Sequence, residues 1–321
     1  LSVADGAGTL FGGAGNDGVY GDSVEGQVQG VKAGADTIYG GDGLDTIFGG
    51  GNDDVIFDVW DGSLYGGNGA DLLAVELRGV FATGLAFAGD ESENDGADRV
   101  FVSGYYETTT AELGAGDDVF IAYAFGDNGE GESGRRIDVV SGGTGGDLIS
   151  TWEGDDTRDG GGGADVIWGG AGVDTITGGP DSDYLYGGQG DGDLLIGGDG
   201  GDFYYWARND GSDRIEDQDP GGVAQDNYIL VFAGFSDGGN DENGDAFIDG
   251  AGVFEVDGNL YDNDGDDMVQ ITVDPDDSSR LVLTVLQGEG AGSTLNFDPD
   301  EITMIGLSNS DTGQVTAYQW V

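Results

Sequence analysis

Apolar residues occur in short clusters that recur about every nine positions, and glycine and aspartate bound each cluster. In Gly160–Trp168 and Gly169–Thr177, an aspartate is followed by three residues of which the central one, Ile167 or Ile176, is aliphatic. Successive side chains of a strand point to opposite faces, so the central residue points inward and its neighbours point outward. The pattern therefore predicts an all-β chain of very short strands separated by tight glycine turns.

The repeating unit has the form Gly-Gly-x-Gly-x-Asp-x-U-x, where U is apolar. Seven copies fit it: Gly12–Tyr20, Gly40–Phe48, Gly66–Ala74, Gly142–Ser150, Gly160–Trp168, Gly169–Thr177 and Gly197–Tyr205. An eighth copy, Gly178–Tyr186, has Asp181 in place of the third glycine. Self-similarity at a fixed period predicts a solenoid, in which two nonapeptides complete one coil. The U residues should form buried columns: Val19, Ile38, Ile47 and Leu73 in the first block, and Ile149, Ile167, Ile176, Leu185, Leu195 and Tyr204 in the second.

The turn residues of the repeat predict a site for a hard cation. Glycines allow a sharp turn with φ > 0, which aims carbonyl oxygens at one spot, and the aspartate adds a carboxylate. Oxygen ligands in a flexible loop suit Ca²⁺. The predicted ligands in the repeats are Gly12, Gly15, Asp17, Asp36, Gly40, Gly43, Asp45, Asp53, Gly66, Gly69, Asp71, Asp98, Asp118, Gly142, Gly145, Asp147, Asp156, Gly160, Gly163, Asp165, Gly169, Gly172, Asp174, Gly178, Asp181, Asp183, Gly187, Asp193, Gly197, Gly200 and Asp202.

These nonapeptides resemble those of the RTX (repeats-in-toxin) family of secreted bacterial proteins, over roughly residues 12–74 and 142–205. The resemblance implies a right-handed parallel β-roll that binds several Ca²⁺ ions and a chain that is exported by the type I secretion machinery. In that family the module follows very different effector domains, including metalloproteases, lipases, pore-forming toxins, adhesins and surface-layer proteins. The resemblance therefore indicates the fold and the ion, but not the activity.

Four segments are expected along the chain. Residues 1–74 form a first RTX block, 142–205 a second, and 206–321 a β-rich C-terminal cap and secretion-type region. Residues 75–141 read as the same solenoid with wider coils, or alternatively as a small β-domain inserted between two rolls. Strands are expected in the cap at Met268–Val273, Leu281–Leu286, Ser293–Phe297, Ile302–Leu307 and Val315–Trp320.

Two degenerate copies and two acidic loops stand apart from the regular repeats. Gly49–Phe57 reads as a copy with one residue deleted, and Thr151–Asp159 keeps Gly154 and Asp156 but has Arg158 at the core position. The acidic loops alternate possible ligands: Asp241, Asn243 and Asp245 in one, and Asp262, Asp264 and Asp266 in the other. Both lack the Glu that completes an EF-hand, so they are either calcium sites of another kind or solvated turns.

Composition narrows the class of protein. The formal charge is −55, yet 37 % of the residues are hydrophobic and 10 % aromatic, which is too many for a solvated acidic tail. Repulsion among the carboxylates predicts a chain that is disordered without calcium and folded with it. Without His or Cys, a serine triad and a disulfide framework are excluded. No apolar stretch approaches the length of a membrane span, and a polyanion should avoid nucleic acid and anionic lipid.

These observations favour a secreted, extracellular, calcium-binding structural protein of the bacterial surface or matrix, of a surface-layer, filament or adhesin-like kind. Its partners would be further copies of the chain or a surface polysaccharide, and no catalytic function is expected. One alternative is the C-terminal secretion and folding module of a larger enzyme or toxin, because the chain begins in mid-coil. A second is a glycan-binding adhesin that uses outward aromatics on one sheet: Trp168, Tyr184, Tyr186, Phe203 and Tyr205.

Overall fold

The computed structural model describes residues 7–22, 34–59, 62–76, 83–87, 96–104, 108–124, 137–207, 210–216, 228–232, 259–261, 267–285, 293–297, 304–308 and 315–319. Every regular element in these ranges is a strand. The chain divides into two compact units, Leu1–Gly170 and Ala171–Val321. The four-segment division expected from the sequence stays a prediction.

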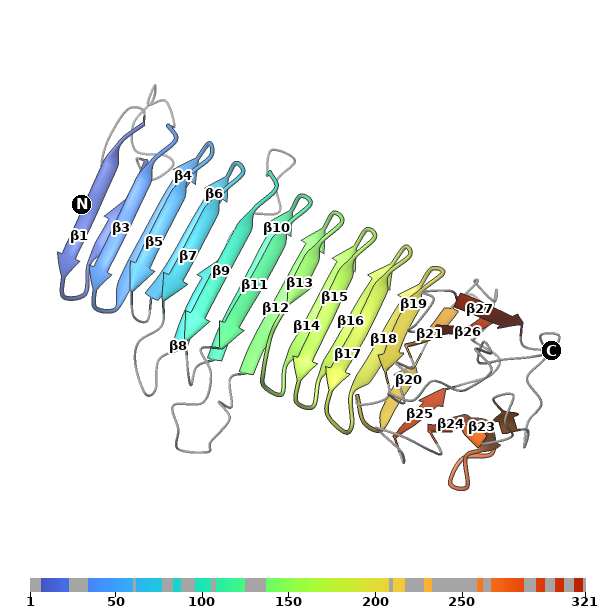
Figure 1. Ribbon diagram of the computed structural model, residues 1–321. Coiled ribbons are helices and arrows are strands. Elements are labelled where there is room, and N and C mark those ends of the chain that lie inside the picture. Colours follow the sequence, from blue (N-terminus) through green and yellow to red (C-terminus); the bar gives the residue numbers. More distant parts are fainter. Residues whose placement is uncertain are drawn as a thin grey trace, which may run out of the picture. The chain divides into compact units, whose positions relative to one another are not determined.

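The first unit is a roll of two parallel sheets, and the chain alternates between them from one strand to the next (Figure 1). One sheet contains β1 (Thr9–Ala14), β3 (Thr37–Asp42), β5 (Val55–Val59), β7 (Leu72–Glu76), β9 (Arg99–Gly104), β11 (Val119–Ala124), β13 (Leu148–Ser150) and β15 (Val166–Ala171). The other contains β2 (Gly18–Tyr20), β4 (Asp45–Gly51), β6 (Gly62–Asn68), β8 (Thr83–Phe87), β10 (Thr108–Ala115), β12 (Ile137–Thr144) and β14 (Thr157–Gly162).

The U residues pair with one another from coil to coil and form the core. Ile38 is in register with Leu10 on one side and Ile56 on the other, and Ile149 lies between Phe120 and Ile167. All of these side chains are at most 1 % exposed. Every residue predicted for the two inward columns is buried in this way, because the strand alternation follows directly from the position of the aspartate.

The middle of the chain belongs to the same solenoid. β9 pairs in parallel with β7 and with β11, and β11 pairs with β13 of the second repeat block. Two of its strands, β10 and β12, have eight residues, whereas β9 and β11 have six, as β14 and β15 do in the second repeat block. The parallel pairing of the described strands favours one continuous solenoid over a separate inserted β-domain, and the wider coils stay a prediction.

The second unit continues the same plan and then changes it. β16 (Thr175–Pro180), β18 (Leu194–Asp199) and β20 (Asp213–Glu216) form one parallel set, and β17 (Tyr184–Gln189), β19 (Phe203–Ala207) and β21 (Tyr228–Phe232) form the other. β25 (Thr294–Phe297) joins β20 in parallel, and β24 (Leu281–Val285), β23 (Asp267–Val273) and β22 (Asn259–Tyr261) follow antiparallel to one another. β26 (Met304–Ser308) joins β21, with β27 (Val315–Gln319) antiparallel to it.

These antiparallel strands are the cap expected from the sequence, with ends that differ by one or two residues from the predicted ones. A solenoid needs such a cap because its last coil would otherwise expose strand edges and an apolar column. Arg280 fastens the cap to the roll, since its Nη2 donates a hydrogen bond to the carbonyl of Ile215 in β20, at 2.5 Å.

Candidate calcium sites

A row of aspartates runs along the turns that precede β3, β5, β7, β9, β11, β13 and β15. The N–H of each except the last donates a hydrogen bond to Oδ1 of the aspartate one coil further on, over 2.6–2.9 Å. The row comprises Asp36, Asp54, Asp71, Asp98, Asp118, Asp147 and Asp165, and Gly8 donates to the first of them. Each of the seven is at most 1 % exposed. The stacking of coils thus fixes one carboxylate oxygen of every turn.

Some turns on the opposite side contain the same bond. In the first unit Asp17 donates to Asp45 over 2.8 Å, and Asp138 donates to Asp156 over 2.6 Å. In the second unit the same bond joins Asp174 to Asp193 and Asp193 to Asp213, and it also joins Asp183 to Asp202 in the turns before β17 and β19.

The second carboxylate oxygen points into a small space over the first glycine of the repeat. A Cβ added to Gly21 would lie 2.6 Å from Asp36 Oδ2, and close to the carbonyl oxygen of Gly49. A Cβ on Gly49 would meet Asp54 Oδ2, and would lie 2.6 Å from the carbonyl oxygen of Gly66. Only glycine leaves this space open. We call it the turn site: it is bounded by the first glycine, the aspartate Oδ2 and the carbonyl of the first glycine one coil on.

Several of these Oδ2 atoms are buried and accept no hydrogen bond in the described part of the chain: those of Asp17, Asp36, Asp45, Asp54, Asp58 and Asp147. A buried carboxylate that is not compensated costs several kcal/mol. Oxygen-only surroundings that combine one carboxylate with backbone carbonyls fit a hard cation such as Ca²⁺. Among the described residues no three His, Cys, Asp or Glu side chains gather into a metal-binding group, so each turn site would rely mainly on carbonyls.

Burial also perturbs the acidity of the row. Desolvation, strengthened by neighbouring aspartates, raises the pKa of Asp54 from 3.8 to about 8 and that of Asp147 to about 7. It likewise raises the pKa of Asp36. At neutral pH and without a cation, Asp54 and Asp147 therefore retain much of their proton. Calcium binding must displace that proton, so calcium and protons compete for the same oxygen.

The structure places most predicted ligands at equivalent positions. The third glycines Gly15, Gly43, Gly69, Gly145, Gly163, Gly172 and Gly200 all have φ between 101° and 151°. Asp181 takes over this role with a φ of 77°. The first glycines Gly12, Gly40, Gly142, Gly178, Gly187 and Gly197 each lie against the aspartate of their own repeat. The two acidic loops with Asp241, Asn243, Asp245, Asp262, Asp264 and Asp266 lie outside the described residues.

At one repeat, the aspartate that lies in the buried row is one position after the predicted ligand, Asp53. Asp53 is exposed and accepts a hydrogen bond from Ala70 N–H, whereas Asp54 is buried in the row. Gly49–Phe57 is a full nonapeptide, in which Asn52 replaces the third glycine and adopts a φ of 74°. Counting back two positions from the buried Ile56 identifies Asp54 as the aspartate of the repeat.

The same count finds aspartates that the glycine pattern missed. Asp138 and Asp213 each stand two residues before a buried apolar residue, Val140 and Ile215. Asp58 has no such signal: it lies on β5, where burial and the nearby Asp45 raise its pKa to about 7. Its proximity to Asp45 arises only when the coils stack.

In the last turn of the roll, two aspartates accept hydrogen bonds from aromatic side chains. Trp206 Nε1–H donates to Asp213 Oδ2 over 3.1 Å, and the Tyr186 hydroxyl donates to Asp210 over 3.2 Å. Burial raises the pKa of Asp213 to about 7 and that of Tyr186 to about 12. Tyr186 is thus not the free outward ring expected from the sequence. Tyr184, beside it, stacks on Phe203 with ring centroids 4.7 Å apart.

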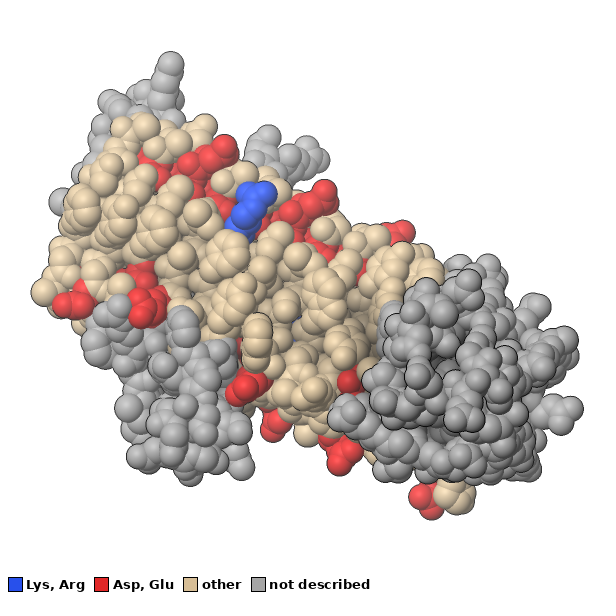
Figure 2. All heavy atoms as spheres, viewed as in Figure 1, with Lys and Arg blue, Asp and Glu red and all other residues tan. Residues whose placement is uncertain are grey.

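Outward rings also line the first unit. Phe11, Tyr39 and Phe57 stack at 5.0 and 5.3 Å, and on the other sheet Tyr20, Phe48 and Tyr65 stack at 5.1 and 4.5 Å. On the face shown in Figure 2, acidic side chains gather towards the margins of the strands and leave the middle largely uncharged.

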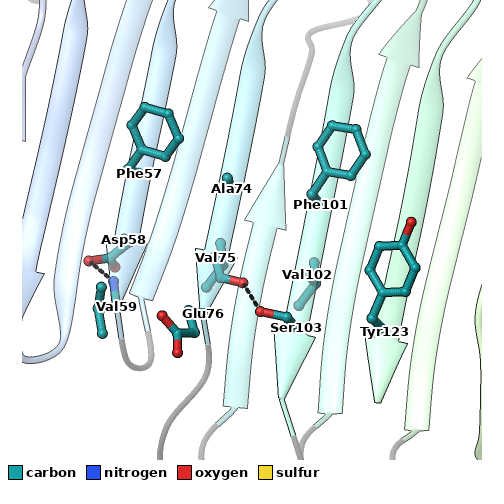
Figure 3. A pocket seen from close by; sticks show the side chains of 10 residues that line it. All are labelled: Phe57, Asp58, Val59, Ala74, Val75, Glu76, Phe101, Val102, Ser103 and Tyr123. Carbon is teal, nitrogen blue, oxygen red and sulfur yellow. Dashed lines mark hydrogen bonds between the residues drawn. The ribbon is translucent and has the colours of Figure 1, made fainter. Parts of the chain in front are cut away.

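A groove of about 250 Å³ interrupts the first of these stacks. Ala74 is in register with Phe57 on one side and Phe101 on the other, and Figure 3 shows the two rings flanking it. Glu76 and Ser103 lie further along the same strands. The stack thus lacks one ring at Ala74.

The fold and the turn sites define a class of protein, a parallel β-roll whose turns are built for hard cations. Comparison with protein families agrees: the RTX calcium-binding nonapeptide repeat matches in four copies, at residues 4–24, 32–57, 132–167 and 159–194. The chain therefore carries RTX calcium-binding repeats. Proteins with these repeats are generally secreted, and the repeats themselves are typically non-catalytic. No curated protein matches the chain. None of the described segments forms a helix that is long and apolar enough to cross a membrane.

Proposed function

We propose that this protein is a secreted structural component of the bacterial surface or extracellular matrix, and that it folds when Ca²⁺ enters the turn sites. The observation that carries the proposal is the set of buried Oδ2 atoms that accept no hydrogen bond in the described part of the chain, those of Asp17, Asp36, Asp45, Asp54 and Asp147. Each ion would neutralise one carboxylate and tie it to the next coil through a glycine carbonyl. Calcium would thus supply cohesion that a chain with a charge of −55 otherwise lacks.

The surface of the roll supports a structural role. Stacked rings on both sheets of the first unit are partly solvent-exposed, with Phe11 64 % and Tyr39 38 % exposed. A contiguous row of exposed rings is typical of a contact surface. Because calcium orders the strands that carry the rings, contacts made by this surface should depend on calcium as well.

The test is whether the purified chain changes shape and assembles when calcium is added. Circular dichroism and light scattering would follow the chain from excess chelator to millimolar Ca²⁺, with Mg²⁺ as the control ion. We expect a disordered chain in chelator, a β-rich one in calcium, and growth in mass that follows folding. An unchanged spectrum would contradict the calcium sites. Folding without any assembly would favour a secretion and folding module of a larger protein.

The groove at Ala74 favours a second candidate, binding of a glycan. Phe57 and Phe101 are two strands apart, which is roughly 10 Å and leaves room for one ring between them. A sugar ring offers apolar faces to the two aromatic rings, and hydroxyls to Glu76 and Ser103. Ala74→Phe would fill the gap with the missing ring. It should abolish binding of an oligosaccharide in titration calorimetry while keeping the fold. Equal binding by the variant would exclude the groove.

A further inference from the structure

One buried turn of the first unit departs from the repeat at two positions. Thr151 stands where the first glycine belongs, and Arg158 stands at the core position of β14, in register with Val140. Arg158 is 0 % exposed, Asp156 1 % and Thr151 3 %. A guanidinium in an otherwise aliphatic column is costly to bury unless its surroundings compensate the charge.

The surroundings that compensate it are those of a turn site. Arg158 Nη2 donates one hydrogen bond to Asp156 Oδ2 and another to the carbonyl oxygen of Gly169, both at 2.7 Å. Gly169 is the first glycine of the repeat one coil on. The other oxygen, Asp156 Oδ1, accepts from Asp138 N–H, as the aspartates of the first row accept from one another. The guanidinium therefore bridges the same carboxylate oxygen and the same carbonyl that a cation would bridge elsewhere.

The neighbouring regular turn shows the difference. At Gly142 a Cβ would clash with Asp147 Oδ2 and with the carbonyl of Gly160, so only a glycine leaves the space between these oxygens free of a side chain. Asp147 Oδ2 accepts no hydrogen bond there. At the departing turn the Thr151 side chain enters the corresponding space, and its hydroxyl donates to the Gly169 carbonyl over 2.8 Å. The two departures from the repeat thus close the turn site together, because Thr151 fills its space and Arg158 supplies a positive charge.

We propose that Arg158 is a built-in replacement for calcium: the turn of residues 151–156 takes no ion, and the guanidinium joins its coil to the next without one. This inference rests on the proposed calcium sites of the neighbouring turns. Its consequence is that one coil is held together at any calcium concentration. In a solenoid each coil is stabilised by its neighbours, so a pre-joined coil is a nucleus from which ordering spreads as calcium binds.

The first experiment restores the repeat in the full chain with the double variant Thr151→Gly and Arg158→Ile. Bound calcium is measured by equilibrium dialysis at saturation, with Arg214→Ile as the control because Arg214 is half-exposed and pairs with the nearby Glu216 at 2.6 Å. We expect the double variant to bind one more Ca²⁺ per chain than the wild type, and the control to bind the same number. An unchanged number in a folded double variant would overturn the proposal.

The second experiment needs no calcium and tests Arg158 even if the turn sites bind none. Amide hydrogen exchange is followed in excess chelator for the wild type, Arg158→Lys and Arg158→Met. We expect the amides of residues 156–169 to exchange at least tenfold more slowly than those of the regular turns in the wild type. The protection should be partly kept by Lys, which retains the charge, and lost in Met. Equal protection in the wild type and Arg158→Met would refute the replacement.

Discussion

Replacing the buried Asp54 with asparagine should have opposite effects with and without calcium. Its folded-state pKa, about 8, lies above the ordinary 3.8. The protonated carboxyl therefore stabilises the metal-free fold fully below pH 4, and this contribution is lost as the pH rises through 8. At pH 7, holding that proton costs roughly 4 kcal/mol, at about 1.4 kcal/mol per pH unit. The free energy of unfolding of an ordinary domain is about 5–15 kcal/mol. A few such carboxylates together cost a similar amount, so they are enough to unfold the metal-free roll at neutral pH.

Asparagine needs no proton, and its carbonyl can still accept the hydrogen bond from Asp36 N–H. In chelator, Asp54→Asn should therefore raise the pH at which the β signal in circular dichroism disappears. In calcium the same variant loses one charged ligand and should bind the ion more weakly. The matched control is Asp53→Asn, which removes the same formal charge from an exposed neighbour.

We expect Asp53→Asn to leave both the pH midpoint in chelator and the calcium affinity close to those of the wild type. If both variants raise the midpoint equally, general charge repulsion explains the pH dependence, and the buried carboxylate does not. If Asp54→Asn lowers the midpoint in chelator, the reasoning from burial is refuted.

Three other substitutions test the core, a turn and the cap. Ile167→Ala removes a fully buried side chain and should lower the free energy of unfolding in calcium by about 2–5 kcal/mol, whereas Trp168→Ala, one position on and facing outward, should cost about 1 kcal/mol or less; urea titrations would compare them. Gly143→Ala places a Cβ at a φ of 104° and against a carbonyl, so it should lower the melting temperature, whereas Gly146→Ala, with no atom closer than 3.1 Å, should not. Arg280→Met removes the bond from the cap to β20, and limited proteolysis in calcium should then cut the cap while sparing the roll.

The fold could be predicted from the sequence because one rule places every side chain. The aspartate marks the turn, and the residue two positions later is buried, so Ile38 and Leu195 were identified without any knowledge of their neighbours. The errors came from reading the glycines first. That order picked Asp53 instead of the buried Asp54 as the aspartate of its repeat, and it overlooked Asp138, whose turn lacks the glycines but keeps the spacing to Val140.

Other features could not be predicted because they depend on contacts between coils. Arg158 stood out in the sequence, but its partner carbonyl is eleven residues away in the next coil. The Tyr186 ring was expected to point outward, and its hydroxyl instead reaches Asp210, which is 24 residues away along the chain. The nine-residue period predicts whether a residue lies in the turn, in the core or on the surface of its own half-coil. It does not predict which other coil a long side chain contacts.

The bond from each aspartate N–H to the next aspartate has a consequence for how such a gene can lengthen. The two partners are separated by 18 residues between Asp36 and Asp54, by 27 between Asp71 and Asp98, and by 29 between Asp118 and Asp147. The same bond forms in each case, so the additional residues between two partners do not disturb the row of aspartates. Duplication of a DNA segment that encodes one 18-residue coil inserts a complete, self-matching rung, whereas duplication of a single nonapeptide moves all later residues to the opposite sheet. The coil, and not the nonapeptide, is thus the smallest unit that unequal recombination can add or remove while preserving which residues the two faces display.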